Sequence, residues 1–456
     1  MLSAKRENFG SRLSVIFAMA GSAIGLGNIW RFPYMTGEHG GSAFVLVYIV
    51  ATLLVSLPVF VAEVVIGRHS RANASLAFTT LAPGRKFWKA IGFLPILIPT
   101  VIASYYSVIG GWSMEFFFKS CSLTFVNASL EESGSLFGSF ISGTFGPIAM
   151  HLLFLFLTVL VVAGGVKTGI EKFSKLTLPL LFILIVIIAT YSISLPGAGA
   201  GLRYLFKPDI SELTPKTFTY ALGQSFYSLS LGMGAIITYG SYVHKDENIF
   251  ATSAGTAISD LLFALLAGVA IMPAVFAAGI APGSGPGLIF QSIPYIFTEM
   301  SIKMPLISTI MAILFFFTVI VAAMTSCVSL VEVVVGFLIE KFGMRRLTSC
   351  IVVFLVCGGL GILCSLSFGP LSGIKVAGKT IFDVFDWLSS NVLLLVMSFL
   401  VVIFTGFVMK RKDVYDEFTN GGTLKGNARQ FGIIYFLIKW VAPIAVLLIF
   451  ITNFII

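Results

Sequence analysis

Long apolar runs separated by short polar and basic segments dominate this sequence. A helix needs about 20 predominantly apolar residues to cross the hydrocarbon core of a bilayer, and most of the runs reach or exceed that length. We therefore expect an all-α polytopic membrane protein. Eleven spans are predicted, at residues 13–33, 43–66, 87–118, 146–164, 176–195, 218–242, 248–279, 305–339, 347–365, 381–409 and 433–454.

Glycines interrupt the first span near its middle. Gly21, Gly25 and Gly27 lie within seven residues, and each weakens a helix by about 1 kcal/mol relative to alanine. Backbone that leaves a helix inside a membrane is tolerated where it lines a cavity or binds a ligand. Freed carbonyls beside the Asn28 amide would suit a small hard cation. The alternative is a GxxxG packing face formed by Gly21 and Gly25.

A second interruption occurs in the sixth span. Residues 228–234 read Ser-Leu-Ser-Leu-Gly-Met-Gly, which again breaks an apolar helix near its middle. Paired interruptions at corresponding positions of two halves are typical of transporters that are built from inverted repeats and bind their substrate at mid-membrane. Two coincident packing faces would explain the same glycines less economically.

Other spans bring polar side chains to the same depth. In the eighth span, Ala322, Thr325, Ser329 and Glu332 share one helical face. Asp260 lies about twelve residues into the seventh span. A carboxylate at that depth is costly unless a cation or a hydrogen-bond donor meets it. The alternative is a protonated Asp260 that bonds a neighbouring hydroxyl.

The ends of broken helices indicate the kind of ligand. A free helix N-terminus presents unpaired N–H groups and a positive dipole end, which bind carboxylates. The phenols of Tyr105 and Tyr106 in the third span can donate to the same anion. Free carbonyls that bind a cation and free amides that bind an anion together indicate a zwitterion or a carboxylate held beside Na⁺.

Composition supports a membrane protein and sets its orientation. The chain is 57% hydrophobic and 11% charged, with a formal net charge of +9. If the N-terminus is cytoplasmic, 20 of the 29 Lys and Arg residues fall on the cytoplasmic side and seven on the other, as the positive-inside rule requires. That distribution argues against nucleic-acid binding. The five cysteines and four histidines lack the spacing of a disulfide framework, a metal site or a catalytic cluster, so an enzyme is not expected.

Three connections on the outer side are longer than a turn requires. They comprise residues 120–145, 196–215 and 281–303, and the last is rich in Pro and Gly. We expect residues 281–303 to form a re-entrant or short-helix lid. Long ordered loops of this kind suit a gated vestibule, and surface decoration is the alternative.

Four segments carry a resemblance to a known family. They are AGSAIGLGNIWRFPY at 20–34, GGSAFVLVY at 40–48, SLSLGMGAIITYGSY at 228–242 and VAAMTSC at 321–327. Over nearly its whole length the sequence resembles the neurotransmitter:sodium symporter family, in particular its bacterial amino-acid members. The resemblance implies a LeuT-type 5+5 inverted repeat with discontinuous first and sixth helices, in the bacterial inner membrane. The first repeat would be 1–200, the second 201–410 with its lid at 281–303, and a cytoplasmic loop with the last span 411–456.

The resemblance also implies two sodium sites. The first would use the carbonyl of Ala23 and the side chains of Asn28, Ser228 and Asp260, completed by the substrate carboxylate. The second would use the carbonyls of Gly21, Ile24 and Ala322 and the hydroxyls of Thr325 and Ser326. Position 260 is Asp where many members have Asn, and position 264 is Ala. We therefore expect transport to be independent of chloride.

The substrate site implied by the resemblance lies between the two breaks. The carboxylate would meet Tyr106 and the amides of Leu26 and Gly27. The amino group would meet carbonyls near Ala23, Tyr227 and Ser230. The side-chain pocket would be lined by Ile102, Tyr106, Tyr227, Met233, Ser326 and Leu330. Because this lining is aliphatic and aromatic without charge, hydrophobic L-amino acids are expected as substrates.

The resemblance further implies gates above and below the site. Arg31 and Asp386 match the outer pair, with Tyr106 and Tyr227 as an aromatic lid. Arg6 and Glu340 match the inner pair. Gly169 and Pro179 enclose a segment whose local unwinding would admit water to the second sodium site.

The expected activity is sodium-coupled symport by alternating access. A proton-coupled transporter of the same architecture is the nearest alternative, since Asp260 and Glu332 could carry protons. An ion channel is less favoured because the breaks occur once per half of a single chain.

Overall fold

The computed structural model describes residue 10 and residues 12–282 and 288–455, and every regular element in these ranges is a helix. An isolated bridge between Val376 and Lys379 is the one strand-like pairing there. The helices of the first part are α1 (Arg12–Ala23), η1 (Gly27–Arg31), α2 (Phe32–Glu38), α3 (Ser42–Ala51), η2 (Thr52–Ser56), α4 (Leu57–Ser70), α5 (Ala74–Leu81), α6 (Lys86–Ile91), α7 (Leu94–Cys121), α8 (Thr124–Asn127), α9 (Leu130–Ile141), α10 (Phe145–Ala163), η3 (Val166–Glu171) and α11 (Lys172–Ser194).

The second part has the same all-helical character. Its helices are α12 (Ala198–Phe206), η4 (Ile210–Glu212), α13 (Pro215–Ser228), α14 (Ala235–Gly240), α15 (Ile249–Ala277), α16 (Ser292–Ser301), α17 (Pro305–Phe342), α18 (Arg346–Leu366), α19 (Ile381–Leu388), η6 (Ser389–Leu393), α20 (Leu394–Ile403), η7 (Phe404–Val408), α21 (Arg411–Thr419), α22 (Lys425–Phe436), η8 (Leu437–Val441) and α23 (Ala442–Ile455). The η elements are π-helical turns within longer helices, except η4, which is a 3₁₀ turn.

The number of membrane spans depends on how the broken helices are counted. In the described ranges, nine helical stretches are long and apolar enough to cross a membrane, and the bent pair Ser14–Ala23 and Gly27–Glu38 makes a tenth. The remaining predicted span, 218–242, is divided into α13 and α14, of 14 and six residues. Each half is too short to cross alone, so the predicted eleven is reached when the two halves form one crossing.

Both predicted helix breaks are present. α1 ends at Ala23, and the chain bends by 43° before it continues as η1. The second break separates α13 from α14. In it Gly232 and Gly234 have φ values of +73° and +76°, a backbone conformation that glycine adopts at no steric cost. A β-carbon on Gly232 would also lie 2.5 Å from the carbonyl oxygen of Leu394.

Two polar segments are helical. Residues 411–432, predicted as a loop between two spans, contain α21 and the first turns of α22, and the apolar helical stretch of the last span begins at Lys425. These turns form because apolar side chains recur on one face, and Val414, Phe418 and Phe431 are buried. The segment from Gly169 to Pro179 is helical here, through η3 and α11. Its unwinding stays a prediction.

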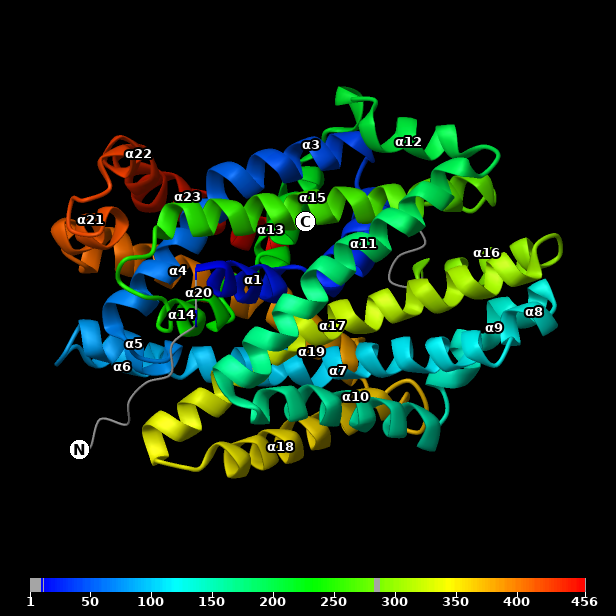
Figure 1. Cartoon of the computed structure of the whole chain (residues 1–456), viewed down its shortest axis with the longest axis horizontal. Helices are drawn as coiled ribbons and strands as arrows, with labels where there is room; N and C mark the ends of the chain where they lie inside the picture. The colour runs from blue at the N-terminus through cyan, green and yellow to red at the C-terminus, as the bar shows by residue number, and fades with distance from the viewer. Residues whose placement is uncertain (1–9, 11, 283–287, 456) are drawn as a thin grey trace.

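The connections gather at two opposite ends of the molecule. Figure 1 shows α8, α9, α12 and α16 at one end of the long axis and α5, α6 and α21 at the other. The three long connections that were predicted to be outer thus contain short helices at the same end of the molecule. This agrees with the prediction that all three lie on one side of the membrane. The short helix α16 lies within the predicted lid, whose residues 283–287 fall outside the described ranges.

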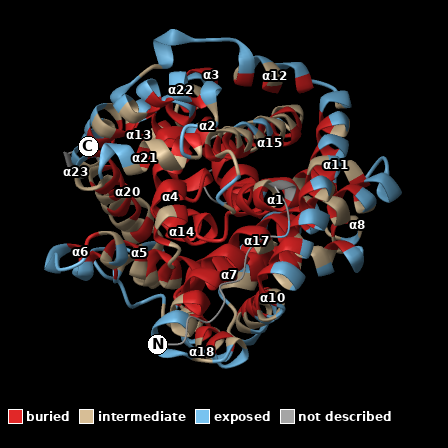
Figure 2. Cartoon of the chain, turned by 60° about the vertical axis from the view of Figure 1, so that its left-hand side comes forward, coloured by how far each residue is buried: buried red, intermediate tan, exposed pale blue. Residues whose placement is uncertain are grey.

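Burial is concentrated around the two broken helices. In Figure 2 the buried residues surround α1, α4, α14 and α17, while exposed residues lie on the periphery. The packing there is close, since a β-carbon on Gly67 of α4 would lie 2.0 Å from the carbonyl oxygen of Ile237 in α14. Small residues permit this approach of helix backbones in a membrane protein.

Candidate functional site

Three polar side chains from three segments meet beside the first break. Asn28 comes from η1, Ser228 from the end of α13 and Asp260 from α15, and all are buried. The Asn28 side-chain nitrogen donates to Asp260 Oδ1 at 2.8 Å and to Ser228 Oγ at 3.0 Å. Ser228 Oγ lies 2.9 and 2.8 Å from the two Asp260 carboxylate oxygens. The structure thereby brings together Asn28, Ser228 and Asp260 of the first predicted sodium set, and its fourth member, Ala23, lines the cavity described below.

The chemistry of this cluster fits a hard cation. It offers two carboxylate oxygens, a hydroxyl and an amide, and such ions prefer oxygen ligands of these kinds. In this arrangement Asn28 and Ser228 donate hydrogen bonds to the Asp260 carboxylate, and the Asn28 side-chain oxygen accepts from the Gly25 amide at 3.0 Å. A half-turn of the Asn28 amide would exchange a donor for an oxygen ligand at the carboxylate.

Tyr48 joins the cluster without having been predicted. Its hydroxyl lies 3.3 Å from Ser228 Oγ and 3.4 Å from Asp260 Oδ2. The side chain is fully buried in α3. Its position at the end of GGSAFVLVY was the available signal, because a phenol in an apolar run needs a hydrogen-bond partner.

The second predicted sodium set is also assembled. Thr325 Oγ1 donates to the carbonyl of Ile24 at 3.0 Å and to that of Ala322 at 2.8 Å. Gly21 lies near Thr325, since a β-carbon on Gly21 would be 3.9 Å from Thr325 Cβ. Ser326 Oγ instead donates to the carbonyl of Ser22 at 3.1 Å. Several oxygen atoms thus converge between α1 and α17.

A narrow cavity lies between the two breaks. It is lined by Ala23, Gly27, Ile102, Tyr106, Tyr227, Ser230, Met233, Ser326 and Leu330, all of which belong to the predicted substrate site. The volume of this cavity is only about 10 Å³, so the cavity must widen to admit a ligand.

Leu26 takes part in this site through its backbone. Its amide donates to the Tyr106 hydroxyl at 3.1 Å. The Ser22 carbonyl, on the other side of the break, accepts from Ser326 Oγ and from Ser230 Oγ at 2.8 Å. The groups freed by the first break therefore bond to α7, to α17 and to the second break.

Glu63 of α4 holds the second break. Its side chain is fully buried, and its Oε1 accepts the Gly232 amide at 2.7 Å. This carboxyl oxygen replaces an acceptor that an unbroken helix would have supplied. Glu63 was not predicted as a site residue, although a carboxylate within the apolar run 57–66 was a visible signal.

Arg31 and Asp386, the predicted outer gate pair, each contact other residues of the site. The Arg31 guanidinium bonds Gln224 Oε1 at 3.3 Å and lies 4.7 Å from the centre of the Tyr227 ring. Asp386 attracts Arg31 electrostatically and accepts from Ser390 Oγ at 3.3 Å. An ion pair between Arg31 and Asp386 stays a prediction for a more tightly closed state.

On the side predicted to face inward lies an ion pair that no motif indicated. Glu332 of α17 is fully buried, and the Arg346 guanidinium bonds its two oxygens at 2.7 and 3.2 Å. Tyr242 donates to Glu332 Oε1 at 2.9 Å. Arg346 escaped notice because it begins the next helix, beyond a turn. Of the predicted inner pair, Glu340 accepts the Asn73 amide at 3.0 Å, and Arg6 lies outside the described residues.

Comparison with known proteins decides the family. The model of the sodium:neurotransmitter symporter family matches residues 6–133 and 141–456. The chain belongs to this family. It is therefore a membrane transporter of a sodium-dependent family, which is a family of transporters and not of enzymes. The resemblance inferred from the four sequence segments is confirmed.

Relatives of this symporter include proteins from bacteria and animals. An uncharacterised sodium-dependent transporter of Bacillus subtilis, YhdH, is 36% identical over 454 residues and covers 99% of this chain and 98% of its own. The sodium- and chloride-dependent taurine transporter of Canis lupus familiaris is 26% identical, covering 90% of this chain and 73% of its own.

A solved structure of the same family confirms the fold. The crystal structure of MhsT in complex with L-phenylalanine is 39% identical in sequence to this symporter and superposes with a TM-score of 0.90. The match covers 98% of this chain and 99% of that one. The predicted LeuT-type fold is therefore confirmed.

Proposed function

We propose that this symporter couples sodium entry to the uptake of hydrophobic L-amino acids, both aliphatic and aromatic. The observation that carries the proposal is the cavity between the two helix breaks. Its lining is apolar and aromatic, without a charged side chain, and backbone amides and carbonyls adjoin it. An uncharged substrate side chain and a zwitterionic backbone match these two kinds of surface. The structural relative crystallised with L-phenylalanine is consistent with this assignment.

Two sodium ions would bind beside the substrate. The first would lie among Ala23, Asn28, Ser228 and Asp260, and the substrate carboxylate would complete its ligands. The second would lie among Gly21, Ile24, Ala322, Thr325 and Ser326. Because the first ion and the substrate share a contact, each raises the affinity for the other by the same factor.

Transport would proceed by alternating access. The substrate carboxylate would take the Leu26 amide and the Tyr106 hydroxyl, and its side chain would widen the cavity between Ile102 and Met233. Tyr227 and Arg31 would then close the outer side. Opening on the inner side would require the Arg346–Glu332 pair to rearrange, since it joins α17 to α18. The first repeat (1–200) and second repeat (201–410) would move relative to each other, with the N-terminus in the cytoplasm of a bacterial cell.

Uptake into proteoliposomes tests the coupling ion. An inward sodium gradient should drive accumulation of labelled leucine or tryptophan, because both proposed cation sites consist of oxygen donors. An imposed proton gradient without sodium should give none, since Glu332, one of two candidate proton carriers, is held by Arg346. Accumulation driven by protons alone would replace this proposal with proton coupling, and substrate-independent current would indicate a channel.

Replacing chloride should leave uptake unchanged. The Asp260 carboxylate already supplies a fixed negative charge at the first sodium site, so an additional anion has no charge to balance. Uptake would be measured in sodium chloride and in sodium gluconate at equal ionic strength. A collapse of uptake in gluconate would show that Asp260 does not fulfil this role.

A further inference from the structure

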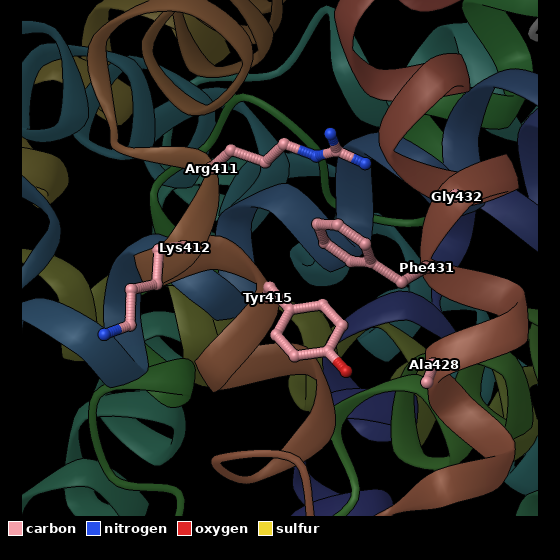
Figure 3. Close-up of a pocket in the computed structure, with 6 residues that line it drawn as sticks. All are labelled: Arg411, Lys412, Tyr415, Ala428, Phe431 and Gly432. Atoms are coloured by element: carbon pink, nitrogen blue, oxygen red, sulfur yellow. The ribbon is translucent and has the colours of Figure 1, made fainter.

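A basic and aromatic pocket lies far from the transport site, between α21 and α22. It has a volume of about 440 Å³ and is lined by Arg411, Lys412, Tyr415, Ala428, Phe431 and Gly432 (Figure 3). The membrane-spanning stretch Ile381–Val408 ends three residues before Arg411, and the stretch Lys425–Thr452 contains the other wall. The pocket therefore lies at the membrane boundary, where lipid headgroups are found.

Arg411 supplies positive charge to this pocket, which we call the headgroup pocket after its place at the membrane boundary. Its side chain extends from α21 across toward Phe431 of α22, whereas Lys412 points away from that ring (Figure 3). The guanidinium carbon lies 5.9 Å from the centre of the Phe431 ring and 5.7 Å from that of Tyr435. Within the described ranges neither Arg411 nor Lys412 forms an ion pair. Two cations at a membrane surface without a carboxylate partner favour an external anion.

The aromatic wall is a packed part of the fold. Phe431 is only 4% exposed. Its ring meets Tyr415 edge to face at 5.1 Å and stacks on Tyr435 at 5.3 Å, measured between ring centres. The aromatic wall beside Arg411 is thus held in place by contacts between α21 and α22. A pre-formed wall lowers the entropic cost of binding.

A third cation, Lys439, lies deeper in the last span, in η8. The Lys439 ammonium is 4.9 Å from the Phe407 ring centre, 5.7 Å from that of Trp440 and 5.9 Å from that of Tyr435. Tyr435 is thus shared between Lys439 and Arg411. A lysine inside a membrane extends its charge toward the headgroups. Arg411 and Lys439 therefore both favour an anion near the first turns of α22.

An apolar surface continues from the pocket into the membrane. Gly432, Phe436 and Trp440 are spaced by four residues and share one helical face. Phe436 and Trp440 are 56% and 51% exposed, and Gly432 lines the pocket. A molecule with an anionic head in the pocket would therefore place its tails along this face. A water-soluble phosphate would use only the upper part.

We propose that this headgroup pocket binds an anionic phospholipid. The phosphate would accept charge-assisted hydrogen bonds from Arg411, with Lys412 adding to the attraction. The acyl chains would lie along Phe436 and Trp440. The bound lipid would join the short helix α21 to the last span, on the side opposite the outer connections.

Lipid binding by the full-length protein tests this proposal. The purified transporter would be titrated in detergent with phosphatidylglycerol and, separately, with phosphatidylcholine of the same chains, and bound lipid counted by native mass spectrometry. Phosphatidylglycerol should bind more tightly. Arg411→Gln should weaken its binding by about fivefold, the factor expected for one basic group at a membrane surface. Phosphatidylcholine binding should change little.

Two further variants separate the pocket from general surface charge. Arg429→Gln removes the same charge from an exposed position on α22 that does not line the pocket, and it should leave phosphatidylglycerol binding intact. A β-carbon on Gly432 would meet nothing within 4 Å, so the larger side chain of Gly432→Leu can extend into the pocket, and it should weaken binding with no change in charge. Thermal unfolding would show that each variant is folded.

Three results would overturn the proposal. The first is equal loss in Arg411→Gln and Arg429→Gln, which would indicate non-specific attraction. The second is undiminished binding in Gly432→Leu, which would place the lipid elsewhere. The third is full competition by glycerol 3-phosphate at the same concentration as the lipid, which would make the ligand a soluble phosphate.

Discussion

Replacing Asp260 with alanine should abolish sodium-dependent substrate binding. The Asp260 carboxylate is fully buried and bonds both Asn28 and Ser228. In the proposed first sodium site, this carboxylate is the charged ligand that would offset the cost of bringing Na⁺ into the membrane, and the variant lacks it. Binding of labelled leucine to the purified protein would be measured with sodium and with potassium. The sodium-dependent part should disappear in the variant.

Asp260→Asn is the matched control for this prediction. It keeps the shape and one oxygen of the side chain and removes the charge. Sodium affinity should fall by about tenfold, which corresponds to about 1.4 kcal/mol, and uptake should begin to respond to chloride. Both variants would be checked for folding by size-exclusion chromatography. Normal sodium-dependent binding by a folded Asp260→Ala protein would refute the first sodium site.

Replacing Gly25 with alanine should reduce uptake at least fivefold. A β-carbon at this position would lie 2.0 Å from Ser326 Oγ and 3.0 Å from the Tyr106 hydroxyl. It would occupy the space between the first break and the cavity wall, and overpacking of this kind costs about 1–3 kcal/mol. Initial rates of sodium-driven leucine uptake would measure the loss.

Two other glycines provide controls for Gly25. A β-carbon on Gly223 or on Gly255 would meet nothing within 4 Å. Gly223→Ala and Gly255→Ala should retain most of the uptake. If Gly25→Ala transports as well as they do, close contact at this point is not required for transport.

The architecture and much of the site could be predicted because their signals are local. Apolar runs reveal membrane spans wherever they occur, and glycines inside such runs reveal the two breaks. The motifs around Asn28, Ser228 and Thr325 then identified residues that the structure brings together. Each of these inferences depends on residue types within a short stretch of chain.

The remainder depends on partners that are distant in sequence. Arg346 was missed because nothing in its own segment indicates a buried carboxylate on the preceding helix. Tyr48 and Glu63 were missed since their partners, Asp260 and Gly232, lie in other spans. The segment 411–432 was expected to be a loop because its polar residues masked the face that buries Phe418. Such contacts follow from tertiary packing, which periodicity along one helix does not report.

The bond between the Leu26 amide and the Tyr106 hydroxyl has a consequence for the return half of a transport cycle. A symporter must return from its inward-facing to its outward-facing form without bound substrate. Unpaired polar groups in the binding site would slow that step. The Leu26 amide, which is proposed to bind the substrate carboxylate, here bonds the Tyr106 hydroxyl. The cavity beside it has room for almost no water. Because the amide and the phenol pair with each other in this closed form, resetting through such a form would not depend on a substitute ligand.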